Sequence, residues 1–308
     1  MSDPVEPAAR RFVHICYCCD DADVVTDFFV QGLRMKNTMR TPDEYGSGEI
    51  LGIDGMIRSL GSFVYDQRGP RVSPAIEVQA WFDPAPVGEP STDPFEVGIK
   101  ALGIAVPSMS GGVADLLALG CRVVADAAAP SGERQITLLD ARDVTLDLVE
   151  DAAIDAAATR LHHLRVTVSD LDRSVGFYVA LGFDVVERGP VVDARFLGVD
   201  DPVDGEWARL RLPDEPFELR LHQWSSPAGH GRHYAEPFHR GLFRAALAVD
   251  DTRGSYDRLT EAGMDFDRPP MQYELHGTPV PDMWITFVSD PDGIPFEFVQ
   301  RPRSAFRQ

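Results

Sequence analysis

Seven ionisable side chains interrupt runs of sequence that are otherwise apolar and strand-like, and they are the residues best suited to chemistry. An imidazole or a carboxylate can bind a divalent metal or move a proton, whereas a guanidinium stays protonated and holds anions by paired hydrogen bonds. Each could instead be structural, as a hydrogen-bonded strand histidine or as one half of an ion pair. The seven are His14, Glu77, Asp147, His163, Arg220, Arg244 and Glu297.

The elements that must position these side chains follow one plan that occurs four times along the chain. Each copy has an apolar strand, a Ser- or Asp-containing helix opener, an amphipathic helix and a glycine that ends it. From strand start to glycine the separations are 18, 19, 19 and 19 residues, because the strands start at 14, 101, 163 and 244 and the glycines are Gly32, Gly120, Gly182 and Gly263. The four segments agree both in this spacing and in the residues that begin and end each helix, which indicates an internal repeat.

Further strand-like runs follow each glycine, so that every copy predicts a βαβββ module. The modules span about 11–82, 98–150, 160–225 and 240–301. A proline-rich stretch at 83–94 and an Ala/Asp-rich stretch at 150–160 separate them. We expect an α+β protein with two domains of two modules each, at 1–150 and 158–308.

Two segments carry a family resemblance. His163-Leu-Arg-Val-Thr-Val-Ser-Asp170, followed by Phe177-Tyr178 and Leu181-Gly182-Phe183, resembles the first strand and helix of the vicinal oxygen chelate superfamily. This superfamily includes glyoxalases, bleomycin-resistance proteins and extradiol dioxygenases. The segment Ser289–Gln300 resembles its last turn and strand. The resemblance implies mixed sheets that curl into cups, with metal ligands at the start of each first strand and the middle of each last strand.

If consecutive modules pair, the resemblance assigns the metal site to the N-terminal cup. The first-strand positions there are His14 and Ala101, and the last-strand positions are Glu77 and Asp147. One imidazole and two carboxylates suit a divalent ion such as Mn, Fe, Ni or Zn, and Ala101 would leave one coordination position open. We expect His14, Glu77 and Asp147 to be the ligands. Two carboxylates buried together without a cation would be costly.

The C-terminal cup departs from the family pattern. Arg244 stands where extradiol dioxygenases have their second histidine, and a guanidinium offers no lone pair to a metal. We expect Arg220 and Arg244 to bind an anionic group of the substrate, and Glu297 and His163 to be catalytic. Glu297 could instead pair with Arg244 as a structural ion pair. A different module order is also open, since pairing the first module with the fourth would unite His14, Glu77, Arg244 and Glu297.

Composition narrows the classes of partner. The net charge of −20 disfavours nucleic acids and anionic membranes, and no apolar run is long enough to span a bilayer. Three of the four cysteines crowd at Cys16, Cys18 and Cys19, a spacing that indicates no disulfide framework. We therefore expect a cytoplasmic monomer or homodimer with a small-molecule substrate.

Two functional classes remain open. The first is an enzyme that uses a divalent metal to polarise an oxygenated small molecule, as lyases, isomerases and dioxygenases of this superfamily do. The second is a metal-free protein that binds and sequesters a small molecule, as bleomycin-resistance proteins do. Metal content distinguishes the two.

Overall fold

The computed structural model describes residues 8–156, 158–213, 215–275, 278–280 and 282–301. Four α-helices and two short 3-10 helices accompany seventeen strands in this part of the chain. The helices are α1 (Ala22–Leu33), α2 (Met109–Ala118), α3 (Leu171–Leu181), α4 (Thr252–Glu261), η1 (Glu49–Leu51) and η2 (Arg195–Leu197).

The strands form two mixed sheets, each curled around a concave face. The nine-stranded sheet contains β1 (Arg11–Cys19), β2 (Lys36–Arg40), β3 (Glu44–Ser47), β4 (Met56–Tyr65), β5 (Ala75–Asp83), β14 (Gly241–Ala248), β15 (Met271–Glu274), β16 (Asp282–Ser289) and β17 (Pro295–Gln300). The eight-stranded sheet contains β6 (Gly98–Val106), β7 (Arg122–Ala128), β8 (Arg134–Leu139), β9 (Thr145–Glu150), β10 (Arg160–Thr167), β11 (Asp184–Val191), β12 (Asp204–Arg211) and β13 (Glu218–Ser226). We call their concave faces the large cup and the small cup. The α+β fold of four βαβββ modules in two cups is thus confirmed.

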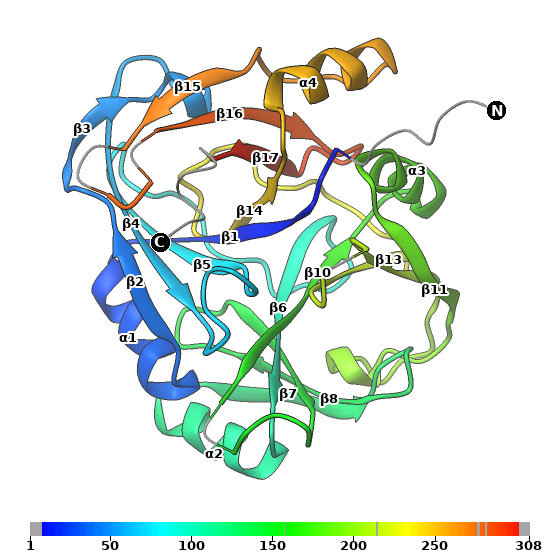
Figure 1. Ribbon diagram of the computed structural model, residues 1–308. Helices are drawn as coiled ribbons and strands as arrows, with labels where there is room; N and C mark the ends of the chain where they lie inside the picture. The colour runs from blue at the N-terminus through cyan, green and yellow to red at the C-terminus, as the bar shows by residue number, and fades with distance from the viewer. Residues whose placement is uncertain (1–7, 157, 214, 276–277, 281, 302–308) are drawn as a thin grey trace.

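The modules pair in a different order from the one expected. β1 runs antiparallel to β14, and β6 runs antiparallel to β10, so module one shares a sheet with module four and module two with module three (Figure 1). The expected pairing of modules one and two is therefore wrong. The apolar residues of the first strands do not determine which first strand each one pairs with. A close contact between β6 and β10 does favour one pairing. Gly103 of β6 lies against the ring of His163, and a Cβ there would fall 2.1 Å from His163 Nδ1.

Local sequence accounts for most helix boundaries. The side chains of Asp21, Asp170 and Asp251 accept hydrogen bonds from backbone amides in the first turns of α1, α3 and α4. Gly182 ends α3 in the left-handed conformation, as expected. Gly32 does not end α1. It lies inside the helix against the Leu119 side chain, and Arg34 takes the left-handed cap.

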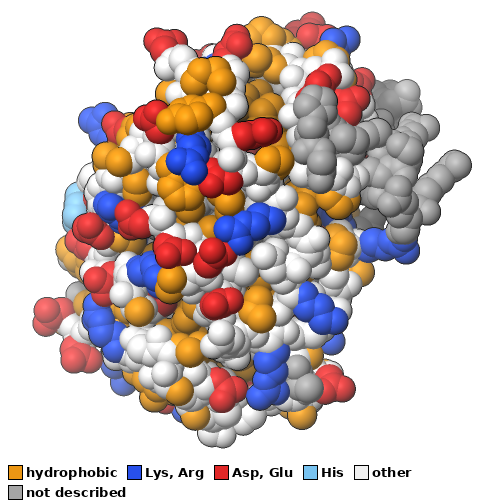
Figure 2. Space-filling model, turned by 90° about the vertical axis from the view of Figure 1, so that its left-hand side faces the viewer, with side chains coloured by type: hydrophobic (Ala, Val, Ile, Leu, Met, Phe, Trp, Pro, Cys, Tyr) orange, Lys and Arg blue, Asp and Glu red, His pale blue; other side chains and the backbone are white. Residues whose placement is uncertain are grey.

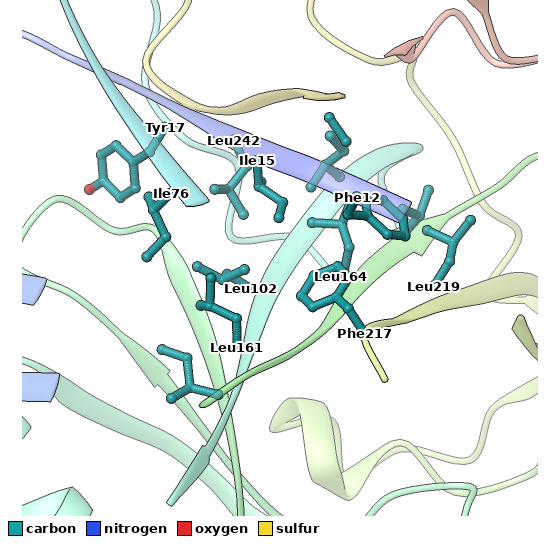
Figure 3. Packing of buried hydrophobic residues seen from close by; sticks show 14 of the residues in the cluster. Phe12, Ile15, Tyr17, Ile76, Leu102, Leu161, Leu164, Phe217, Leu219 and Leu242 are labelled. Carbon is teal, nitrogen blue, oxygen red and sulfur yellow. The ribbon is translucent and has the colours of Figure 1, made fainter. Parts of the chain in front are cut away.

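The main core lies between the convex backs of the two sheets and under the helices. Phe12 and Ile15 of β1 face Leu102 of β6 and Leu164 of β10 across this layer (Figure 3). The other residues of these strands face the cups, because strand side chains point to opposite sides in turn, and a register shift in β1 turns both Val13 and His14 to the large cup. Burying one face of every strand in a shared core leaves the other face free for a site.

The outer surface mixes both signs of charge. Figure 2 shows acidic and basic side chains interspersed on the face that carries β2, β3 and α1, with apolar side chains between them. None of the helices in the described residues is long and apolar enough to cross a membrane.

Candidate active site

Strand register places the candidate residues at equivalent positions in the four modules. Parallel pairing aligns Cys16 with Glu77, Gly103 with Asp147, Arg165 with Arg220 and Ala246 with Glu297. Two residues before the first member of each pair stand His14, Ala101, His163 and Arg244. Each cup therefore receives two first-strand positions and two last-strand positions.

The large cup collects His14, Glu77, Arg244 and Glu297 on its floor, and all four are buried. His14 Nε2 lies 3.3 Å from Glu77 Oε2 and 3.3 Å from Glu297 Oε2. Arg244 contacts the same two oxygens, with Nη2 at 2.8 Å from Glu77 Oε2 and Nε at 3.4 Å from Glu297 Oε2. The imidazole and the guanidinium thus approach both carboxylates.

Gln79 completes this arrangement. Its Oε1 accepts a hydrogen bond from Arg244 Nη1 at 3.1 Å, and its Nε2 donates to Ser59 Oγ at 3.2 Å. Sequence analysis did not single out Gln79, although it follows Glu77 by two residues in a strand and so shares its face. The alternation of side chains along this strand could therefore have identified Gln79 from the sequence.

A cavity of about 360 Å³ opens above these groups. Its volume lies within the range of about 300–1,000 Å³ that is usual for small-molecule sites. The upper walls are mainly apolar, from strands of both module one and module four, and include Met39, Phe63, Tyr273, Met283 and Phe287. The large cup can therefore enclose a small molecule with an apolar body and direct its polar end to the floor.

Charge on the floor is balanced by the protein itself. Burial raises the pKa of Glu297, but the neighbouring His14 and Arg244 outweigh burial and bring the pKa below its ordinary value. The guanidinium of Arg244 and the imidazole of His14 both lie beside the two carboxylates. A buried pair of carboxylates is tolerable when cations contact both.

The floor does not suit a resident divalent metal. The two oxygens nearest His14 Nε2 are the oxygens that Arg244 contacts, so a guanidinium already neutralises the atoms a metal would bind. Within the described part of the chain, no three His, Cys, Asp or Glu side chains are grouped so that they could hold a metal ion. In the same part of the chain, His14 Nε2 lies near both carboxylates without a well-aligned hydrogen bond to either, and Nδ1 has no hydrogen-bond partner, so this imidazole can still engage a ligand.

The small cup gathers the remaining candidates into a closed ionic network. Arg165 donates to both oxygens of Asp147, at 2.7 and 3.2 Å, and His163 Nε2 lies 3.4 Å from Asp147 Oδ2. Arg220 pairs with Glu218 at 2.9 Å and with Glu133. Burial alone would raise the pKa of Asp147, but Arg165 and His163 hold it well below its ordinary value.

Three expected groupings are therefore wrong, because their residues do not lie together in the structure. Asp147 lies in the small cup, away from the expected ligands His14 and Glu77. His163 and Glu297, expected to act together, lie in different sheets, and so do Arg220 and Arg244. The cause is the same in each case, since β1 pairs with β14 rather than with β6. The alternative pairing of modules one and four is the observed one.

Residues 160–298 match the model of the Glyoxalase/Bleomycin resistance protein/Dioxygenase superfamily. This segment of the chain is therefore similar to that superfamily. The matched segment covers modules three and four, which contribute one half of each cup. Members of the superfamily generally use a divalent metal, so the guanidinium on the floor of the large cup is a departure from them.

Relatives and solved structures agree with this placement. Lactoylglutathione lyases of two Neisseria meningitidis strains are 29% identical over 149 residues, covering 46% of this chain and 91% of theirs. Glyoxalase I from Zea mays has the same overall fold, with a TM-score of 0.68 at 18% identity over 97% of this chain and 94% of that one. A putative dioxygenase from Bacillus subtilis has a TM-score of 0.61 at 13% identity, covering 96% of this chain and 87% of its own.

Proposed function

We propose that this chain is a glyoxalase-superfamily enzyme of lyase or isomerase type that works in the large cup without a resident metal. Its substrate is a small oxygenated molecule with an apolar body. One observation carries the proposal: His14, Glu77, Arg244 and Glu297 converge on the floor of the 360 Å³ cavity. The names of the Neisseria relatives support a lyase.

The chemistry of the floor supports proton transfer next to a substrate oxygen. The Glu297 carboxylate, whose pKa is lowered by His14 and Arg244 despite burial, would accept a proton from the carbon beside a carbonyl. The electron pair of that C–H bond would move to the carbonyl oxygen, where Arg244 would stabilise the negative charge. His14 would carry the proton of a hydroxyl on that same carbon to the former carbonyl oxygen. Glu297 would then give the proton it took to the former carbonyl carbon, so that the isomerisation ends with both side chains as they began and with no net change in oxidation state.

The test combines metal content with proton exchange. The protein is purified without chelators or a metal-affinity tag, and metals per chain are measured by plasma mass spectrometry. Hemithioacetals of 2-oxoaldehydes and small apolar hydroxyketones are then incubated in D₂O, and deuterium incorporation is followed by NMR. We expect exchange that EDTA does not abolish and that falls by about 10²-fold or more in Glu297→Gln. Near-stoichiometric metal, retained in His163→Ala and lost in His14→Ala, would overturn the metal-free assignment.

The variant Arg244→His gives a second, independent check. It removes the guanidinium and completes a set of two imidazoles and two carboxylates, which are ordinary ligands for Zn, Ni or Fe. We expect this variant, unlike the parent protein, to retain a divalent ion after dialysis. Equal metal retention by parent and variant would show that Arg244 does not decide metal binding.

A binding protein of the bleomycin-resistance type is the second candidate. The apolar walls of the cavity and the mutual pairing of its floor charges favour it, because a site whose charges satisfy one another can bind without reacting. Saturable binding of an apolar oxygenated compound, with no exchange or turnover in parent or variants, would select this candidate.

A further inference from the structure

The small cup contains a second cavity with a different character. Its volume is about 220 Å³, and it is lined by Thr92, Pro94, Lys100, Arg122, Val124, Thr137, Leu139, Thr145, Arg165 and Leu197. Three of these side chains are cationic and three are threonines, and none of the described residues that line it is acidic. Although the chain has a net charge of −20, all the charged side chains among the described residues of this lining are cations.

Lys100 reaches this cavity through an irregularity of the sheet. Where β6 pairs with β10, Ala101 is opposite Arg165 and Ile99 is opposite Val166, so Lys100 is the additional residue at a register shift. Such a bulge redirects a side chain within a strand. Lys100 is 6% exposed, and its Nζ has Ser91 Oγ at 3.2 Å and a Glu96 oxygen only at 3.9 Å.

The identity of the residue at this position is also informative. The chain has only two lysines, Lys36 and Lys100, so the other 27 of its 29 cationic residues are arginine. Burial lowers the pKa of Lys100 to about 8, although Glu96 opposes the shift. A compact ammonium with three rotatable donors fits a small cavity that a planar guanidinium would fill.

The other two cations are placed to share a ligand with Lys100. Arg165 is buried and fixed by its two hydrogen bonds to Asp147. Arg122 is largely exposed and pairs with Asp143, so it can cover the cavity from the solvent side. Thr145 is buried beside them, and its hydroxyl group can donate to an oxyanion, whereas Thr137 already donates to the Phe196 carbonyl at 2.7 Å.

We propose that the small cup binds a small organic or inorganic oxyanion, a carboxylate or a phosphate, between Lys100, Arg165 and Arg122. The ligand must be compact. At about 30 Å³ for each water, the cavity holds the equivalent of roughly seven waters, which suits a phosphate or a short dicarboxylate and excludes a nucleotide. The site is separate from the large cup and does not depend on the reaction proposed there.

The scarcity of lysine makes a direct measurement simple. Lysine labelled with ¹³C at the ε carbon gives two side-chain NMR signals, from Lys100 and from the exposed Lys36, which serves as an internal control. The full-length protein is titrated with inorganic phosphate and, separately, with succinate, against NaCl at matched ionic strength. We expect one anion to shift the Lys100 signal saturably and to raise its titration midpoint, because a bound anion favours the charged ammonium.

Variants assign the effect to the cavity. Arg122→Met, at an exposed position, should weaken binding by about tenfold, since a charge-assisted hydrogen bond is lost. Arg134→Met, which removes an exposed arginine of β8 paired with Asp126, should leave binding unchanged. Saturation by phosphate alone or by succinate alone identifies the ligand class. Shifts that are equal for Lys36 and Lys100, or unaffected by Arg122→Met, would overturn the proposal.

Discussion

At the scale of single residues, Arg244 decides the character of the large cup. In the plan of the superfamily its position supplies a metal ligand, whereas here it supplies the cation that contacts Glu77 and Glu297. The same two carboxylates are thereby held in an ion cluster with Arg244.

Removing this guanidinium should be strongly destabilising. Arg244→Met leaves two buried carboxylates with only His14 to compensate them, and breaking a buried ion pair from one side costs about 3–5 kcal/mol. We expect a loss of that size in the free energy of urea unfolding at pH 7. The control is Arg195→Met, an exposed ion pair with Asp193, which should change stability by less than about 1 kcal/mol. Equal effects of the two variants would contradict the role given to Arg244.

Glu215 links the two sheets through a titratable group. It is buried in the segment between β12 and β13, and burial raises its pKa to about 7, against opposing contributions from the Phe217 and Phe12 amides and from Arg11. Because the folded-state pKa is raised, its contribution to stability is complete below about pH 4.5 and is lost as the pH rises through 7.

Glu215→Gln should therefore remove part of the pH dependence of the free energy of unfolding. It should not change that free energy by the same amount at every pH. The parent protein should lose about 2–3 kcal/mol from this group between pH 4.5 and pH 8, at 1.36 kcal/mol for each unit of pKa difference. We expect the variant to be more stable than the parent at pH 8 and no more stable at pH 4.5, by urea unfolding at both values. A stability difference that is the same at both pH values would refute this assignment.

At the scale of elements, consecutive modules meet across the two sheets through buried tyrosine–aspartate pairs. Tyr17 of β1 donates to Asp140 in the turn before β9, at 2.7 Å, and Tyr178 of α3 donates to Asp290 in the turn before β17, at 2.8 Å. Each aspartate also accepts backbone amides of its own turn. One last strand of each cup, β9 or β17, is thus held in place by a module of the other cup.

Tyr178→Phe should weaken one of these contacts between modules and lower the free energy of unfolding. The variant leaves the Asp290 carboxylate without its hydroxyl donor, which costs about 1–3 kcal/mol for a buried acceptor. Burial already raises the pKa of Asp290 to about 6, and losing a donor to the charged form should raise it further. The cost should therefore be larger at pH 8 than at pH 5. Tyr45→Phe, at an exposed tyrosine, is the matched control and should be close to neutral at both values.

At the scale of the whole molecule, each cup is built from parts of the chain that lie far apart. The large cup joins residues 11–83 to residues 241–300, and the small cup takes its strands from the residues between them. Cutting the chain between β9 and β10 would separate both β1 from β14 and β6 from β10 (Figure 1).

The two halves should therefore not fold separately. Residues 1–150 and 158–308, expressed alone, each expose the unpaired edges of two first strands, which favours aggregation. Expressed together, they should form a 1:1 complex with the circular dichroism spectrum of the intact chain. Two independently folded, monomeric halves with cooperative unfolding transitions would show instead that consecutive modules pair, contrary to the observed topology.

The sequence by itself determined the modules. Strand and helix periods, aspartate caps and regularly spaced glycines are local properties, so they predicted four βαβββ units and the equivalent positions of His14, His163, Arg244 and Glu297. The family resemblance placed Arg244 where a metal ligand was expected. Only the tertiary structure decided which units share a cup, because the apolar edge of each first strand can pair with any other. That choice moved Asp147 away from His14 and brought Arg244 between Glu77 and Glu297. The candidate site depends on this choice of partner modules, because each module contributes half of the floor residues of its cup.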